Sequence, residues 1–159
     1  MIFLSDAPDV ALIDGSLRDI YILNASVQDW DSILRLARAS SQWDASFSYD
    51  GPDPLFPQQY AEITALPQDA CATLVWKIYG LDLYCHFWLD TEIEFHFDPA
   101  QLNDVNFGSL QDWLRLVGKT LRRDVLVTQE NASNEPLMIY KYEINRILVI
   151  SKTDRWGND

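Results

Sequence analysis

The stretch from Ala72 to Asp98, ATLVWKIYGLDLYCHFWLDTEIEFHFD, constrains the fold more than any other part of the chain. Val, Ile, Tyr, Phe, Trp and Thr dominate it, and these residues suit a pleated, half-buried surface. Gly80 can adopt the positive φ of a tight hairpin, and Asp90-Thr91-Glu92 provides a polar three-residue turn. The stretch therefore predicts three consecutive antiparallel strands joined by short turns.

A register test gives this predicted meander one wholly apolar face. With Gly80-Leu81 and Asp90 to Glu92 at the turns, the expected cross-strand pairs are Ile78 with Leu83, Trp76 with Cys85, Leu74 with Phe87, Leu89 with Ile93, Phe87 with Phe95, and Cys85 with Phe97. Neighbouring residues of a strand point to opposite faces. The second face is therefore expected to carry Lys77, Tyr79, Asp82, Tyr84, His86, Trp88, Glu94, His96 and Asp98. We expect the apolar face to form a core, and the second face to meet water, a covering element or a partner.

Two other segments have helical periodicity. Ser26 is expected to cap a helix whose apolar stripe begins at Val27, and Ser109 a second helix whose stripe begins at Leu110. Two similar pentapeptides, SVQDW and SLQDW, lie at the expected N-termini of these helices. Either capping chemistry or an ancient duplication explains this similarity. Further strands are expected over residues 19–25, 42–49, 125–128, 137–142 and 145–151.

The remaining segments are expected to be less regular. Residues 1–18 predict a short strand or loop, 50–57 a surface loop, 58–70 a helical turn, and 152–159 a polar tail. The fold prediction is thus α+β, a mainly antiparallel sheet with two amphipathic helices on one face. Because a strand precedes each helix and strands follow it, two βαββ-like halves are the simplest description.

Length and charge limit the functions that the chain can have. Its 159 residues fit one domain, residues 1–159, and 24 acidic against 12 basic residues give a net charge of -12. The basic residues are scattered, which argues against a nucleic-acid partner and, together with the acidic excess, favours a basic one. Cys71 and Cys85 lack a metal-type spacing, and no apolar run reaches a membrane-spanning length of about 20 residues. With no signal-peptide pattern at the start, we expect a cytoplasmic protein that is not membrane-bound.

The polar face of the meander holds the candidate functional residues. His86, His96 and Glu94 form a set that could bind zinc or act as a pH-sensitive pair, although an outward strand face is ordinarily polar. Aromatic anchors among acids are typical of protein interfaces, and this composition selects Tyr84, His86, Trp88, Glu94, His96 and Asp98 as partner-binding residues. Helices covering the same face would instead make its aromatic residues part of a core.

Templates for catalysis do not occur in the sequence. It contains no Gly-rich phosphate loop and no G-x-S-x-G nucleophile elbow, and its paired carboxylates are no more than an acidic chain would show. We therefore predict no catalytic residue, no bound metal and no cofactor. Two alternatives remain open: a small metal- or proton-dependent enzyme centred on His86 and His96, and a structural subunit that self-associates.

Two segments, LRDIYILNASVQDWDSILRLAR and EIEFHFDPAQL with the following LQDWLRLVGKTLRRDVLVTQEN, resemble small bacterial immunity proteins of polymorphic-toxin systems. The likeness covers about half of the chain and lies in a strand, a Ser-capped helix with an early Trp, and an E-x-E-F-x-F-D-P strand exit. It implies a cytosolic, non-enzymatic inhibitor that binds a cognate toxin. The acidic surplus and the aromatic-acid face agree with this function, in which the protein occludes the active site of a basic toxin.

Overall fold

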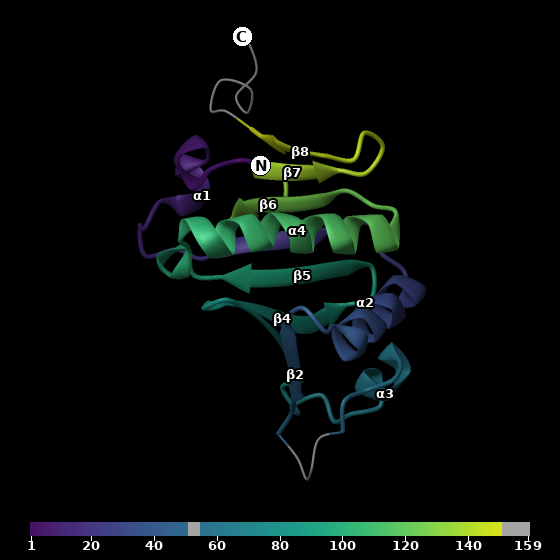
Figure 1. The fold of residues 1–159 in the computed structure, drawn as a ribbon. Coiled ribbons are helices and arrows are strands. Elements are labelled where there is room, and N and C mark those ends of the chain that lie inside the picture. Colours follow the sequence, from purple (N-terminus) through teal and green to yellow (C-terminus); the bar gives the residue numbers. More distant parts are fainter. Residues whose placement is uncertain (51–54, 151–159) are drawn as a thin grey trace.

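Eight antiparallel strands form one sheet, in the order β2-β3-β4-β5-β1-β6-β7-β8, in the computed structural model, which describes residues 1–50 and 55–150 (Figure 1). In chain order the elements, with η for a 3-10 helix, are η1 Leu4–Asp6, α1 Pro8–Ala11, β1 Arg18–Ile22, α2 Val27–Ala39, β2 Asp44–Ser48, α3 Tyr60–Thr64, β3 Thr73–Ile78, β4 Leu81–Leu89, β5 Glu92–Phe97, η2 Pro99–Gln101, α4 Asp104–Leu121, β6 Val125–Gln129, β7 Pro136–Lys141 and β8 Arg146–Val149. The predicted α+β class with a mainly antiparallel sheet is confirmed.

The sheet is continuous, and its two long helices serve as crossovers. α2 connects β1 to β2, and α4 connects β5 to β6, which flank β1 on either side. Because every neighbouring pair is antiparallel, each of these helices joins two strands that run in the same direction. The first strand of the chain thus lies between strands of its second part. Two separate βαββ halves are therefore not how the sheet is built.

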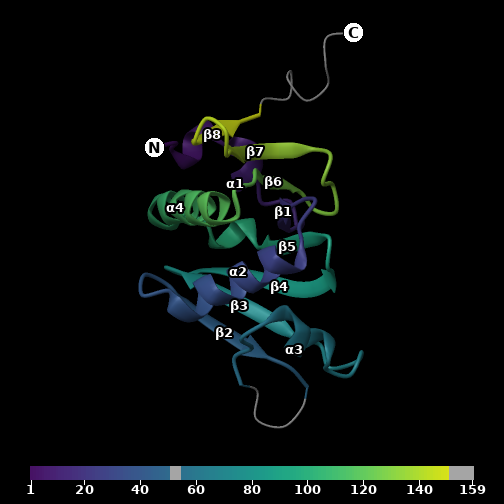
Figure 2. The same ribbon diagram turned by 90° about the vertical axis from the view of Figure 1, so that its right-hand side faces the viewer.

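All the helices that contact the sheet lie on one face of it. Figure 2 shows α4 to one side of the strands, and Trp30 and Ile33 of α2 are fully buried in the same core. Arg18 shares the face of Ile20 and donates hydrogen bonds to the carbonyls of Asp9 and Leu12, which places the α1 region on that face too. The expectation of helices on one face of the sheet holds for the described residues.

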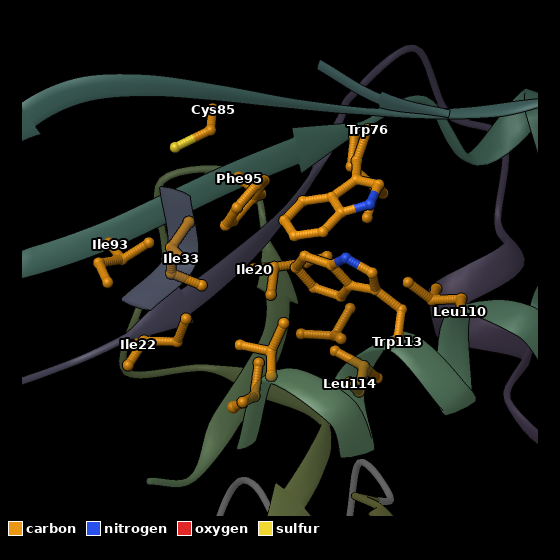
Figure 3. Close-up of a cluster of buried hydrophobic side chains, with 14 of the residues drawn as sticks. Ile20, Ile22, Ile33, Trp76, Cys85, Ile93, Phe95, Leu110, Trp113 and Leu114 are labelled. Atoms are coloured by element: carbon orange, nitrogen blue, oxygen red, sulfur yellow. The ribbon is translucent and has the colours of Figure 1, made fainter. Parts of the chain in front are cut away.

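Three aromatic rings, Trp76, Phe95 and Trp113, meet among aliphatic side chains in the core (Figure 3). The Trp113 ring of α4 stands edge-on to Trp76 of β3, with centroids 5.6 Å apart, and to Phe95 of β5, at 5.0 Å. Edge-to-face pairs of this kind add about 0.5–1.5 kcal/mol beyond the area that they bury. This contact fixes α4 against the apolar side of the meander.

The register predicted for the meander was wrong, by two residues in the first hairpin and, in the second, by two residues at Cys85 and one at Leu89. The first turn is Tyr79-Gly80, with φ of 47° and 86°, so Ile78 pairs with Leu81. Consecutive positive φ values belong to the two-residue turns that match strand twist. The other observed pairs are Trp76 with Leu83 and Leu74 with Cys85 in the first hairpin, and Leu89 with Glu92 and Cys85 with Phe95 in the second.

A shift of two residues preserves the assignment of side chains to faces. Cys85, Ile93, Phe95 and Phe97 accordingly lie in the core as predicted. The second hairpin has a two-residue turn instead of three residues, and an irregularity between His86 and Leu89 absorbs the difference. Leu89 was expected in the core, but beyond this bulge it is 53% exposed.

Two more predictions about local structure were wrong. Residues 1–18 contain the short helices η1 and α1 ahead of β1, and not a strand. The second long helix begins at Asp104, because Asn103 and Asn106 cap it reciprocally through their side chains, and Ser109 lies inside it. Ser26 does cap α2 in a capping box with Asp29, so the repeated SxQDW word has two different structural roles. Residues 51–54 of the predicted surface loop and 151–159 of the polar tail lie outside the described residues.

Candidate binding face

The outward face of the meander carries a row of four neighbouring rings, which we call the ring ladder: Tyr84, His96, His86 and Trp88. Neighbouring ring centroids are 5.4, 5.3 and 5.3 Å apart in that order. The Tyr84–His96 and His86–His96 planes are inclined by only 15° and 26°, so these three rings are stacked. The ladder crosses between β4 and β5, and no described helix packs over it.

Strand register produces the ladder. Tyr84 pairs with His96 and His86 pairs with Glu94, so the two imidazoles are diagonal neighbours and not directly opposite as expected. Diagonal neighbours on one face of a sheet are still within reach of aromatic side chains. The bulge after His86 keeps the side chain of Trp88 near the ladder while Phe87 packs into the core against Trp30, at a centroid distance of 5.0 Å.

Exposure is greatest at the Trp88 end of the ladder, and Tyr84 at the other end is 36% exposed. His86 and His96 are half-buried, whereas Trp88 is 69% exposed. A large aromatic side chain at this exposure leaves most of its ring free for a partner, and aromatic residues are enriched among the side chains that dominate binding energy. Trp88 is therefore the most prominent contact group of the face.

A buried acid network borders the ladder on the β1 side. The Tyr21 hydroxyl donates to Asp19 Oδ2 at 3.0 Å and to Glu94 Oε1 at 3.4 Å, and the Asn131 backbone N–H donates to the same Asp19 oxygen at 2.7 Å. Burial raises the pKa of the Glu94 carboxyl, and the charges of Asp19 and Glu92 raise it further. Burial with the charges of Asp19 and Glu94 also raises the pKa of the Tyr21 phenol. Negative charge is thus concentrated where a cation from outside would relieve it.

The imidazoles favour their neutral forms. Burial lowers the pKa of His86, and the neighbouring His96 lowers it further, since two cations in stacked rings would repel. Burial also lowers the pKa of His96, against an opposing effect of Asp19 and Glu130. At neutral pH the ladder is therefore an uncharged aromatic surface beside carboxylates.

Five of the six residues predicted for partner binding come together on this face, and Asp98 does not. The Asp98 carboxylate accepts the backbone N–H of Ala100 at 2.9 Å and so caps η2 beyond the end of β5. The five that lie in or beside the ladder are Tyr84, His86, Trp88, Glu94 and His96. Asp19 and Tyr21 are buried beside this face and were not predicted, because the pairing of β1 with β5 joins segments more than 70 residues apart.

A hollow of about 550 Å³ opens beside the Trp88 end of the ladder. It lies between the α3 region, the segment leading into β3, and β4, and is lined by Tyr60, Ile63, Thr64, Leu66, Pro67, Gln68, Ala70, Cys71, Ala72, Thr73, His86, Phe87 and Trp88. Sequence reasoning missed this hollow, since residues 58–70 predict little more than a helical turn. Cys71 has an exposed thiol at this site, whereas Cys85 is buried.

The arrangement of side chains does not resemble a metal site. Among residues 1–50 and 55–150, no cluster of three or more His, Cys, Asp or Glu side chains is placed to hold a metal ion. The two imidazoles face each other as stacked rings, which suits contact with a flat group more than shared coordination. The chemistry that the face offers is stacking, hydrogen bonding and attraction of positive charge.

No helix within the described part of the chain is both long and apolar enough to cross a membrane. Comparison of the chain with protein-family models, curated proteins and solved structures finds no significant match.

Proposed function

We propose that the chain is a non-enzymatic binding protein that inhibits a basic protein partner, in the manner of an immunity protein that neutralises a toxin. The observation that carries the proposal is the ring ladder, an uncovered row of aromatic side chains bordered by carboxylates. Such a face combines aromatic side chains, which contribute much of the binding free energy at interfaces, with charges that steer an oppositely charged partner. Occlusion of the partner's active site is the mechanism that this geometry supports.

The cellular compartment follows from the same proposal. Cys71 is a free, exposed thiol and Cys85 a free, buried one. Disulfides are rare in reducing compartments, where exposed thiols persist. We assign the inhibitor to the cytoplasm, where it would protect the cell that makes the toxin.

Binding to a basic, toxin-like protein tests the proposal, and a cationic nuclease is the first probe. Affinity and association rate are measured at rising NaCl concentration for the unaltered chain, for Trp88→Ala and for Tyr142→Ala. Tyr142 is a partly exposed aromatic residue in the turn between β7 and β8, away from the ladder, and serves as the matched control. Loss of a central aromatic anchor costs about 2 kcal/mol or more, which is roughly 30-fold in Kd.

We expect Trp88→Ala to weaken binding by roughly that factor and Tyr142→Ala to leave it unchanged. Association should slow as salt screens the net charge of -12. The proposal is contradicted if the association rate does not change with salt and the affinity does not change in Trp88→Ala. A stoichiometric metal that is lost on His96→Ala would favour the enzyme alternative.

A further inference from the structure

We infer that the hollow beside Trp88 is the subsite for an arginine side chain of the partner. This inference rests on the proposed function and specifies the chemistry by which the face recognises its partner. Three properties of the hollow support it: a wall that is already formed, a surrounding charge that favours a cation, and flat rings that a planar cation can stack on.

The wall of the hollow is held in place by the core behind it. Tyr60 stacks on Trp30 with centroids 5.1 Å apart and planes inclined by 9°, and Phe87 contacts Trp30 at 5.0 Å. The Trp30 indole N–H donates to the Leu89 carbonyl at 3.1 Å, which ties α2 to the end of β4. Both Tyr60 and Phe87 line the hollow. A side chain entering it therefore meets a pre-organised surface, and little ordering free energy is lost on binding.

Charge around the hollow favours a cation. None of its lining residues is Lys or Arg. Asp69 lies in sequence between two lining residues, Gln68 and Ala70, and is exposed. Burial raises the pKa of the Tyr60 phenol, and the charge of Asp90 raises it further, so the Asp90 carboxylate acts on the wall of the hollow. A guanidinium or ammonium group is the complementary occupant.

Flat rings and polar atoms at the mouth select arginine over lysine. Trp88 and His86 contribute rings at 5.3 Å from each other, and cations are attracted to the face of an indole. The Thr73 hydroxyl donates to the Cys71 carbonyl at 3.3 Å, and its Oγ1 lies 3.4 Å from His86 Nδ1, so a hydroxyl oxygen and a carbonyl oxygen that can accept from a guanidinium line the same side. A planar guanidinium stacks on rings and donates several hydrogen bonds in its plane, whereas an ammonium does neither as well.

Short peptides test the subsite without the partner protein. The probes are acetyl-Gly-Arg-Gly-amide, its lysine analogue and its citrulline analogue, which keeps the shape of arginine without the charge. Binding is followed by the NMR signal of the Trp88 indole N–H, assigned with Trp88→Phe. We expect the arginine peptide to shift this signal with a Kd about tenfold lower than that of the citrulline peptide, as a cation–π contact of about 1.4 kcal/mol would give.

Cys71 provides a chemical control. Because Cys85 is buried and Cys71 exposed, N-ethylmaleimide on the folded protein should modify Cys71 alone. The modified protein should lose the arginine-peptide shift, and Cys71→Ser treated with the same reagent should keep it. Equal binding of the three peptides, no binding of any, or shifts confined to Tyr84 and His96 would overturn the inference.

The two proposals fail in distinguishable ways. If the partner protein binds modified and unmodified protein equally, the arginine subsite is wrong and the inhibitor function stands. If the arginine peptide binds as expected but the basic partner does not, the subsite stands and the choice of partner is wrong.

Discussion

The stacked pair His86 and His96 is the part of the candidate binding face that we expect to respond to pH. Their ring centroids are 5.3 Å apart, and Glu94, Tyr84, Thr73 and Trp88 are the other groups that meet them. Burial lowers the pKa of both imidazoles, while Asp19 and Glu130 partly offset the shift at His96. The neutral pair is thus the form that the folded chain favours, and its protonation would add positive charge to a face that attracts cations.

We predict that the protein loses stability over the pH range below about 6.5, the ordinary pKa of histidine. The folded pKa of each histidine lies below its ordinary value of 6.5, so the unfolded chain binds these protons first. Their contribution to stability is full above pH 6.5 and is lost as the pH falls through the folded pKa values. The raised pKa of Glu94 has the opposite sign, and its stabilising effect is full only below its ordinary value of 4.5.

Thermal unfolding across this pH range measures the effect. The melting temperature of the unaltered chain should fall with pH, and the double variant His86→Gln, His96→Gln should show a flatter profile. If the melting temperatures of the unaltered chain and of the double variant fall equally with pH, groups other than these two histidines cause the loss of stability. Binding of the basic partner should weaken over the same range, because a protonated ladder repels it.

At the scale of secondary structure, alternation and helical periodicity predicted the faces correctly, and turns and caps were the source of error. The apolar positions of β3, β4 and β5 determine what is buried, and a register shift of two residues leaves those faces intact. Turn length depends on backbone φ at Tyr79 and on the bulge after His86, which composition does not reveal. Asn103 and Asn106 cap α4 mutually, in place of the Ser that the sequence favoured.

Contacts between distant segments account for what could not be predicted at the site. β1 enters the sheet between β5 and β6, which brings Asp19 and Tyr21 beside Glu94 and His96. The hollow joins Tyr60, Cys71 and Trp88 from three segments with no shared motif. The ladder itself is local to one hairpin, and this is why its four residues and the neighbouring Glu94 were identified from sequence.

Because α4 packs against β7, we predict that replacing two glycines of this helix by alanine has opposite effects on the stability of the protein. A Cβ at Gly118 would overlap the ring of Tyr140, which is fully buried, and would lie 3.1 Å from the Arg123 carbonyl oxygen. A Cβ at Gly108 would meet only the flexible Met1 side chain, at 3.5 Å. Gly118→Ala should destabilise the protein by about 1–3 kcal/mol through overpacking. Gly108→Ala should stabilise it by about 0.5–1 kcal/mol through helix propensity.

Urea denaturation of both variants measures these free energies. Gly108→Ala is the matched control, since the chemical change and the helix are the same. Equal effects of the two substitutions would mean that Tyr140 does not pack against Gly118 as closely as the structure shows.

On the scale of the whole molecule, acidic residues outnumber the basic residues that could pair with them. The described residues contain four ion pairs, Arg18–Asp14, Arg115–Asp112, Arg123–Asp29 and Lys141–Asp124. The pair formed by Arg123 and Asp29 is the one that links α2 to the end of α4, with N and O 3.0 Å apart. Even if all 12 basic residues were paired, 24 − 12 = 12 carboxylates would have no cation. The excess keeps the chain in solution and also opposes its compact state.

We therefore predict that moderate salt stabilises the protein. The Debye length falls from about 30 Å at 0.01 M salt to about 3 Å at 1 M. Rising salt therefore screens the repulsion between distant carboxylates at lower concentration than it screens the attraction within an ion pair. The urea midpoint should rise between 10 mM and 0.5 M NaCl, and KCl should have the same effect because ionic strength is the cause. Sulfate is unsuitable here, since it also strengthens apolar burial. A midpoint that falls with salt would mean that the four ion pairs contribute more to stability than the surplus carboxylates take away. In that case the same carboxylates would also be too weakly coupled to guide a basic partner to the ring ladder.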